Sequence, residues 1–212
     1  MKSEPLTLTR WFVAELIGTM FLSAVAGTAM MAHLGLVSGY SPLYVPFAVG
    51  AVVLVMFYVI GHISGCHLNP AVSVAMFVMR KITFPQFMTY LVAQFLGAWL
   101  GIRLIVGLVG IPPSAPEFVS SSVSLGEFMG AFILVLAIAA VVQGRVKDGL
   151  GGIVIGVALA VGLTLAMVTG GGYLNPAIAA TLGAQDLAYL LMPILGGLAA
   201  AAATTLFDDR KI

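Results

Sequence analysis

Two identical Asn-Pro-Ala triplets, Asn69-Pro70-Ala71 and Asn175-Pro176-Ala177, stand 106 positions apart in this chain of 212 residues. Asparagine is a favoured N-cap, and proline is favoured at the first helical position because its missing N–H has no partner there. Each triplet therefore predicts the start of a helix. An asparagine amide also carries two N–H donors, so its NH2 group can bind the oxygen of a small neutral molecule while its own oxygen caps the helix.

The composition places these triplets in a membrane protein. Hydrophobic residues make up 61% of the chain, charged residues only 8%, and the mean hydropathy is +1.13. In soluble domains about a quarter of the residues are charged, so an ordinary soluble domain is excluded. A net charge of +1 without a basic tract also argues against nucleic acid as a partner. Because Cys66 is the only cysteine, no disulfide forms within the chain.

A membrane-crossing helix needs roughly 20 apolar residues, and the uncharged runs provide six such helices. We predict them near residues 11–32, 43–61, 85–109, 123–143, 150–169 and 187–207. Two apolar segments that are too short to cross remain, at 69–79 and 175–184, and each begins at a triplet. Lysines and arginines mark the cytoplasmic side of membrane proteins, and a topology with both termini in the cytoplasm leaves only Arg103 outside.

The two halves of the chain form an internal repeat. When the triplets are aligned, Gly50 falls on Gly156 and Leu68 falls on Leu174. The repeats, about 8–110 and 122–208, lie in a single domain that covers residues 1–212. Each has three spans, so the second is inverted relative to the first, and the two short helices enter from opposite faces. We expect the glycine-rich stretches 61–65 and 170–172 to be extended backbone, which is tolerated at membrane depth beside a water-filled path.

The segment from Gly61 to Val72, GHISGCHLNPAV, resembles the first signature of the aquaporin, or major intrinsic protein, family. The resemblance extends over nearly the whole chain and includes the second triplet. It implies an all-α integral membrane protein with six transmembrane helices and two re-entrant half-helices in an inverted 3+3 repeat. It also implies a homotetramer in the lipid bilayer with one pore per subunit, a passive channel rather than an enzyme, and no metal or other cofactor.

The resemblance assigns roles to individual residues. Asn69 and Asn175 would donate hydrogen bonds to the permeating molecule at the membrane midplane. Backbone carbonyls would line one wall of the pore, from Gly65, Cys66, His67, Gly171, Gly172 and Tyr173. Glu15 and Glu127 would hold the re-entrant loops through buried hydrogen bonds, because an unpaired carboxyl group inside a membrane is costly. His62 would also help to order the first loop. Cys66, three residues before Asn69, would face the inner vestibule.

The selectivity filter departs from the usual pattern. Most family members carry Arg after the second triplet, where this chain has Ile178, and Ala179 replaces the Asp that follows it in glycerol facilitators. The other three filter positions are Val49, Leu163 and Gly172. Loss of the Arg widens the constriction and removes a cation barrier, but it also removes hydrogen-bond donors.

An aliphatic filter predicts passage of water and of uncharged solutes somewhat larger than water. Glycerol, urea, ammonia, hydrogen peroxide and neutral metalloid acids are the candidates, and the cell membrane is the expected location. The alternative is an ordinary water-selective channel. A secondary transporter would also contain inverted repeats, but it would need buried ionisable residues for coupling, and only Glu15 and Glu127 qualify. A junction protein with a closed pore is a further alternative.

Overall fold

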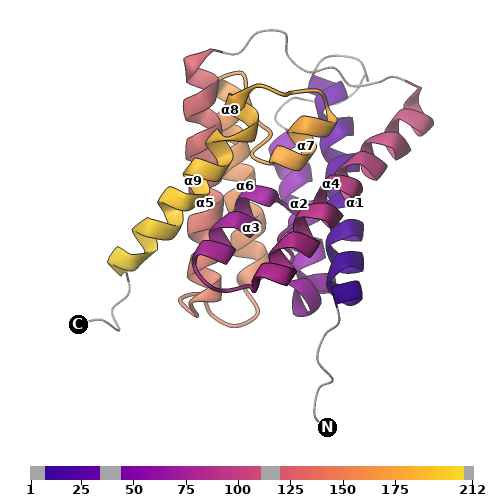
Figure 1. Cartoon of the computed structure of the whole chain (residues 1–212). Coiled ribbons are helices and arrows are strands. Elements are labelled where there is room, and N and C mark those ends of the chain that lie inside the picture. The colour runs from indigo at the N-terminus through magenta and orange to yellow at the C-terminus, as the bar shows by residue number, and fades with distance from the viewer. Residues whose placement is uncertain (1–7, 34–43, 111–119, 208–212) are drawn as a thin grey trace.

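The computed structural model describes residues 8–33, 44–110 and 120–207, and all regular structure in these residues is helical (Figure 1). Six segments are long and apolar enough to cross a membrane. Five are single helices: α1 (Leu8–His33), α2 (Tyr44–Ser64), α4 (Phe84–Val109), α5 (Ser121–Val142) and α6 (Gly151–Val168). The sixth, Leu187–Phe207, consists of α8 (Leu187–Leu190), α9 (Met192–Ala203) and the 3-10 helix η1 (Thr204–Phe207). All six predicted spans are present.

The sixth span is broken at Leu191, where we had expected one continuous helix. Pro193 lies in the first turn of α9 and has no N–H with which to bond the carbonyl oxygen of Tyr189. The chain turns at Leu191, and the following helix then continues to the end of the span. Proline at this point therefore divides an otherwise apolar run into two helices.

Two short helices complete the fold, α3 (Pro70–Val78) and α7 (Pro176–Thr181). They enter from opposite ends of the bundle and approach each other near its middle (Figure 1). The expectation of extended backbone over 61–65 is wrong for most of that stretch, because α2 remains helical to Ser64 and the Gly65 N–H bonds the Gly61 carbonyl at 2.9 Å. The non-helical part of the first re-entrant segment is limited to residues 65–69, and that of the second covers 171–175.

Small residues allow the long helices to approach closely. A Cβ atom added to Gly50 on α2 would lie 2.5 Å from the carbonyl oxygen of Gly156 on α6, and one added to Gly156 would lie 2.7 Å from that of Gly50. These two glycines are the positions that the internal repeat aligns. On α4, a Cβ at Gly97 would lie 2.5 Å from the carbonyl oxygen of Leu16. Contact between backbones is the usual basis of helix packing in membranes.

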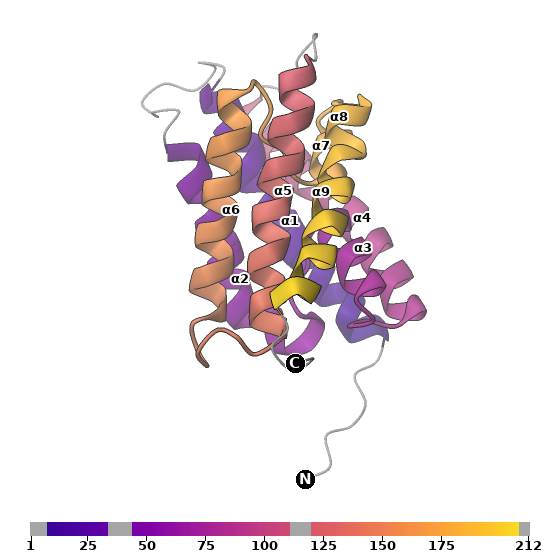
Figure 2. The same cartoon turned by 90° about the vertical axis from the view of Figure 1, so that its left-hand side faces the viewer.

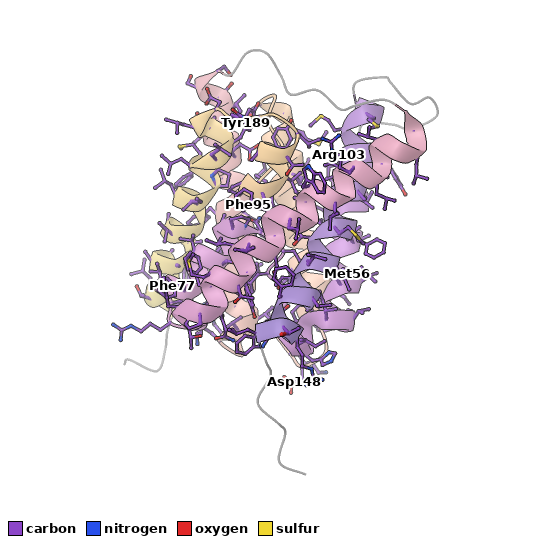
Figure 3. All side chains as sticks on the ribbon, turned by 45° about the vertical axis from the view of Figure 1, so that its right-hand side comes forward. Met56, Phe77, Phe95, Arg103, Asp148 and Tyr189 are labelled. Carbon is purple, nitrogen blue, oxygen red and sulfur yellow. The ribbon has the colours of Figure 1, made fainter. Side chains whose placement is uncertain are left out.

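The described chain begins and ends at the same end of the bundle, as the views at right angles show (Figures 1 and 2). The turn after α3 carries Arg80 and Lys81, and the α5–α6 connection carries Arg145 and Lys147, both at this end. Arg103 on α4 and Tyr189 on α8 lie toward the opposite end of the bundle (Figure 3). Asp148 lies at the end where the described chain begins and ends. The Arg103 guanidinium is exposed and lies 5.5 Å from the centre of the Trp99 ring.

Candidate functional site: two facing half-helices

Both Asn-Pro-Ala triplets begin half-helices in the predicted way. Asn69 is the N-cap of α3, and its side-chain oxygen accepts the Ala71 N–H at 2.9 Å. Asn175 is the N-cap of α7, and its oxygen accepts the Ala177 N–H at 3.1 Å. Pro70 and Pro176 occupy the first turns, where a missing N–H costs nothing.

The two asparagines also tie the half-helices together. The Asn69 side-chain N–H donates to the Leu174 carbonyl at 2.8 Å, and the Asn175 N–H donates to the Leu68 carbonyl at 2.9 Å. Each bond therefore joins an asparagine to the residue that precedes the other one. An amide NH2 group has two hydrogens, and this exchange uses one from each residue. Both side chains line a common cavity, so the second hydrogen of each amide has a place to act.

The residue before each asparagine has a left-handed backbone conformation. Leu68 and Leu174 both have φ 52°, in the left-handed region that residues other than glycine seldom adopt. Two residues earlier, Cys66 has φ 55° and Gly172 has φ 123°. Hereafter the first loop is residues 65–69 and the second loop is residues 170–175. The same unusual conformation recurs in both, so hydrogen bonds from elsewhere must hold it in place.

Glu15 of α1 supplies these bonds for the first loop. Its carboxyl group is fully buried, and it accepts the backbone N–H groups of His67 at 2.9 Å and Leu68 at 2.7 Å. It also accepts the Ser64 hydroxyl at 2.6 Å and the side-chain amide of Gln94 at 2.8 Å. Four donors thus surround one carboxyl group, which removes most of the cost of burying it.

Glu127 of α5 has the corresponding place at the second loop. It is also fully buried, and it accepts the backbone N–H groups of Gly172 at 2.6 Å, Tyr173 at 2.8 Å and Leu174 at 2.6 Å. All three donors belong to the backbone. One carboxyl group therefore orients three successive peptide units of the second loop.

A cavity of about 60 Å³ lies between α1, α2, α5, α6 and the two loops. All four expected filter residues line it: Val49, Leu163, Gly172 and Ile178. Ile178 itself is 3% exposed. The polar side chains on its wall are few, and none of the described Asp, Glu, Lys or Arg residues is among them. This cavity is small and predominantly aliphatic.

Most residues whose carbonyls were expected on the wall also border this cavity, namely Cys66, His67, Gly171, Gly172 and Tyr173. Gly65 does not, because it directly follows the end of α2. His62 lies apart from the loop contacts. It remains on the exposed side of the helical last turn of α2, and no hydrogen bond of its side chain occurs in the described part of the chain, so the structure does not support a loop-holding role for it.

The first loop is also supported by polar residues that the sequence analysis did not identify for this role. Gln94 donates to Ser73 at 2.9 Å as well as to Glu15, and Ser73 lies 3.1 Å from His67 Nδ1. The Tyr90 hydroxyl donates to the Ser64 carbonyl at 2.6 Å. These residues could have been identified from the sequence, because they are polar residues within otherwise apolar helices. Among the described residues, no group of His, Cys, Asp and Glu has an arrangement that could hold a metal ion.

Comparison with known proteins agrees with this architecture. Over 199 residues the chain is 30% identical to Aquaporin AqpM of Methanothermobacter marburgensis, covering 81% of each chain. Over 208 residues it is 31% identical to the Glycerol uptake facilitator protein of Bacillus subtilis, covering 87% of this chain and 73% of the relative. The X-ray structure of the aquaglyceroporin from Plasmodium falciparum superposes with a TM-score of 0.73, at 23% identity, over 92% of this chain and 95% of that one.

Residues 2–206 match the model of the major intrinsic protein family. Members of this family are passive multi-pass membrane channels for water or small solutes and are not enzymes. The fold, the relatives and the two facing triplets agree, and the chain belongs to the major intrinsic protein family.

Proposed function

We propose that this channel conducts small uncharged solutes somewhat larger than water, together with water, through an aliphatic constriction. The observation that carries the proposal is the absence of charge among the described residues that line the cavity, with Ile178 buried where an arginine is usual in the family. A constriction made by Val49, Leu163, Gly172 and Ile178 contains no side chain that binds ions. It selects by size and by how easily a solute gives up its hydration shell.

The asparagines supply the polar part of the pathway. The second amide hydrogen of Asn69 and that of Asn175 donate to the oxygen of a passing solute near the midplane. Carbonyls of the two loops accept hydrogen bonds along the same wall, from Cys66, His67 and their counterparts in the second loop. The N-termini of the half-helices carry partial positive charge at the centre of the pore, which disfavours cations.

The proposed solutes are glycerol, urea, ammonia, hydrogen peroxide and neutral metalloid acids. The names of the two relatives described above, an aquaporin and a glycerol uptake facilitator, cover both water and a polyol, and their identities to this chain are nearly equal, 30% and 31%. An aliphatic constriction lacks the donors that replace the hydration shell of water. It therefore favours conduction of the larger neutral solutes, and it argues against selectivity for water. The water-selective channel is the competing function.

We also propose that four copies assemble in the cell membrane, with both termini in the cytoplasm. The described arginines and lysines other than Arg103 support this orientation, because they gather at the end of the bundle where the described chain begins and ends. Native mass spectrometry of the detergent-solubilised protein measures the number of copies. Protease cleavage of tags on intact spheroplasts measures the orientation.

Stopped-flow light scattering on proteoliposomes tests the conducted solutes. Vesicles are exposed to an impermeant osmolyte and to inward gradients of glycerol, urea and a neutral metalloid acid. We expect fast reswelling with the three permeant solutes, at rates linear in their concentration. Fast shrinkage in the impermeant osmolyte without any solute entry would instead identify a water-selective channel and contradict the proposal.

Replacing Ile178 by Arg tests the constriction itself. The charged side chain narrows the cavity and restores donors, so we expect glycerol entry to fall on the order of tenfold while water flux is kept or increased. Ile178→Leu, which preserves volume and polarity, is the matched control. Unchanged solute selectivity in Ile178→Arg would show that residue 178 does not control passage.

A further inference from the structure

One face of α6 lines the cavity along its whole length. Ile155, Leu159, Leu163 and Met167 are spaced four residues apart, and all four border the cavity. Met167 stands one turn beyond the expected filter residue Leu163, in the last turn of α6. Because α6 runs toward the end of the bundle that carries α7, Met167 lies toward that mouth of the cavity (Figure 1).

The Met167 side chain fills space beside the second loop. A Cβ atom added to Gly172 would lie 2.7 Å from Met167 Cγ, a distance at which one of the two must move. Met167 thus occupies the volume that a side chain at position 172 would need. Residue 172 lacks a side chain, and the neighbouring helix provides one in its place.

The first half of the repeat has the opposite arrangement. The alignment that pairs the triplets places Gly61 at the position of Met167 and Cys66 at that of Gly172. Here the helix residue is glycine and the loop residue carries the side chain. A Cβ added to Gly61 would lie 3.9 Å from the Cys66 Cβ, so these positions are neighbours as well. The side chain comes from the loop in one half and from the helix in the other.

We propose that Met167 is a selectivity-determining residue of the pore, in addition to Val49, Leu163, Gly172 and Ile178. This inference rests on the proposed conduction of neutral solutes. A methionine side chain is unbranched and has three rotatable bonds, so it fills an irregular gap without a fixed shape. It fills the space beside Gly172, and it sets the size of the neutral solute that passes.

The experiment compares glycerol and water permeability in proteoliposomes. Met167→Ala enlarges the gap, and we expect the ratio of glycerol to water permeability to rise about threefold or more. Met167→Phe fills the gap with a rigid ring, and the ratio should fall below that of the wild type. Met129→Ala is the control, because Met129 is 42% exposed on the outer surface of α5 and does not border the cavity. Its ratio should stay at the wild-type value.

Chemical labelling gives an independent measurement. In a Cys66→Ser background, a charged thiol reagent added from the side of α7 should block solute flux through Met167→Cys. The flux through the Cys66→Ser protein without this change should be the same before and after the reagent is added.

The outcomes separate the inference from the proposed function. A wild-type channel that conducts glycerol, with the same permeability ratio in Met167→Ala and Met167→Phe, would overturn the role of Met167 alone. Failure of Met167→Cys to respond to the reagent would overturn it as well. Wild-type vesicles that admit no solute would overturn the proposed function and, with it, this inference.

Discussion

The two loops share the backbone conformation of the leucine that precedes each asparagine, but the side chains that support them differ. In both loops the leucine before the asparagine has a left-handed backbone conformation. Each asparagine side chain also donates a hydrogen bond to a backbone carbonyl of the other loop. The aromatic contacts also correspond: His67 and Tyr90 meet edge to face at 5.0 Å, and Tyr173 and Tyr189 meet at 4.9 Å. The geometry next to the two asparagines is therefore common to both halves.

Three polar side chains around the first loop, those of Ser64, Ser73 and Gln94, have no polar counterparts around the second. In the alignment of the triplets, Ser64 corresponds to Gly170 and Ser73 to Ala179. The helices α4 and α8–α9 align separately, with Tyr90 on Tyr189, and there Gln94 corresponds to Pro193. The first loop is therefore held by Glu15 and its side-chain partners, whereas the second depends mainly on Glu127. The two halves therefore share the geometry beside the cavity and differ in the side chains that support it.

The largest difference between the loops concerns chemical access to the pore. Cys66 gives the first loop a thiol that borders the cavity, and the matching position of the second loop is Gly172. A thiol reagent supplied from the side of α3 should therefore reduce flux on the order of tenfold, and Cys66→Ser should abolish this block. Solute flux measured by light scattering, with reagent added to one side at a time, tests this. Equal block of wild type and Cys66→Ser would contradict it.

The second loop should be more sensitive to loss of its carboxyl group than the first. Glutamine has one acceptor oxygen where glutamate has two, so Glu127→Gln leaves a backbone N–H of the second loop without an acceptor. This N–H cannot turn toward another partner, and we expect the free energy of unfolding to fall by about 2–4 kcal/mol. In Glu15→Gln, the Ser64 hydroxyl and the Gln94 amide can rotate to new partners, so the loss is smaller. Thermal unfolding midpoints in detergent compare the two variants. A larger drop for Glu15→Gln would show that side-chain support does not buffer the first loop.

Sequence alone was sufficient for the features that local chemistry determines. Capping by Asn69 and Asn175 follows from residue type, and apolar length specifies the six spans. The place of Met167 could not be derived in this way, because it depends on how far a helix side chain reaches toward a loop five residues away. The exposure of His62 was missed for a related reason: where α2 ends decides whether that residue joins the loop. The break before Pro193 was readable, since proline removes a helical hydrogen bond.

Coupling within the network of the first loop should be measurable. Gln94 joins Glu15 to Ser73, so Gln94→Leu and Ser73→Ala remove parts of one network, and their effects should deviate from additivity by about 0.5–1.5 kcal/mol. The pair Gln94→Leu and Met129→Ala is the control, since Met129 lies on the exposed surface of another helix. Unfolding of the single and double variants gives the coupling energy. Additive effects in the first pair would mean that these contacts act independently.

The smallest expected effect comes from the two tyrosines that pack behind the loops. Tyr90 donates its hydroxyl hydrogen to the Ser64 carbonyl, so Tyr90→Phe leaves a buried acceptor without that partner and should cost about 1 kcal/mol of stability. The hydroxyl of Tyr189 is buried and has no hydrogen-bond partner within the described structure, so Tyr189→Phe should be neutral or slightly stabilising. The removed atom is the same in both variants, and thermal unfolding compares them directly. Equal losses would mean that the Tyr189 hydroxyl stabilises the fold as much as the Tyr90 hydroxyl does, and would contradict this difference between the two halves.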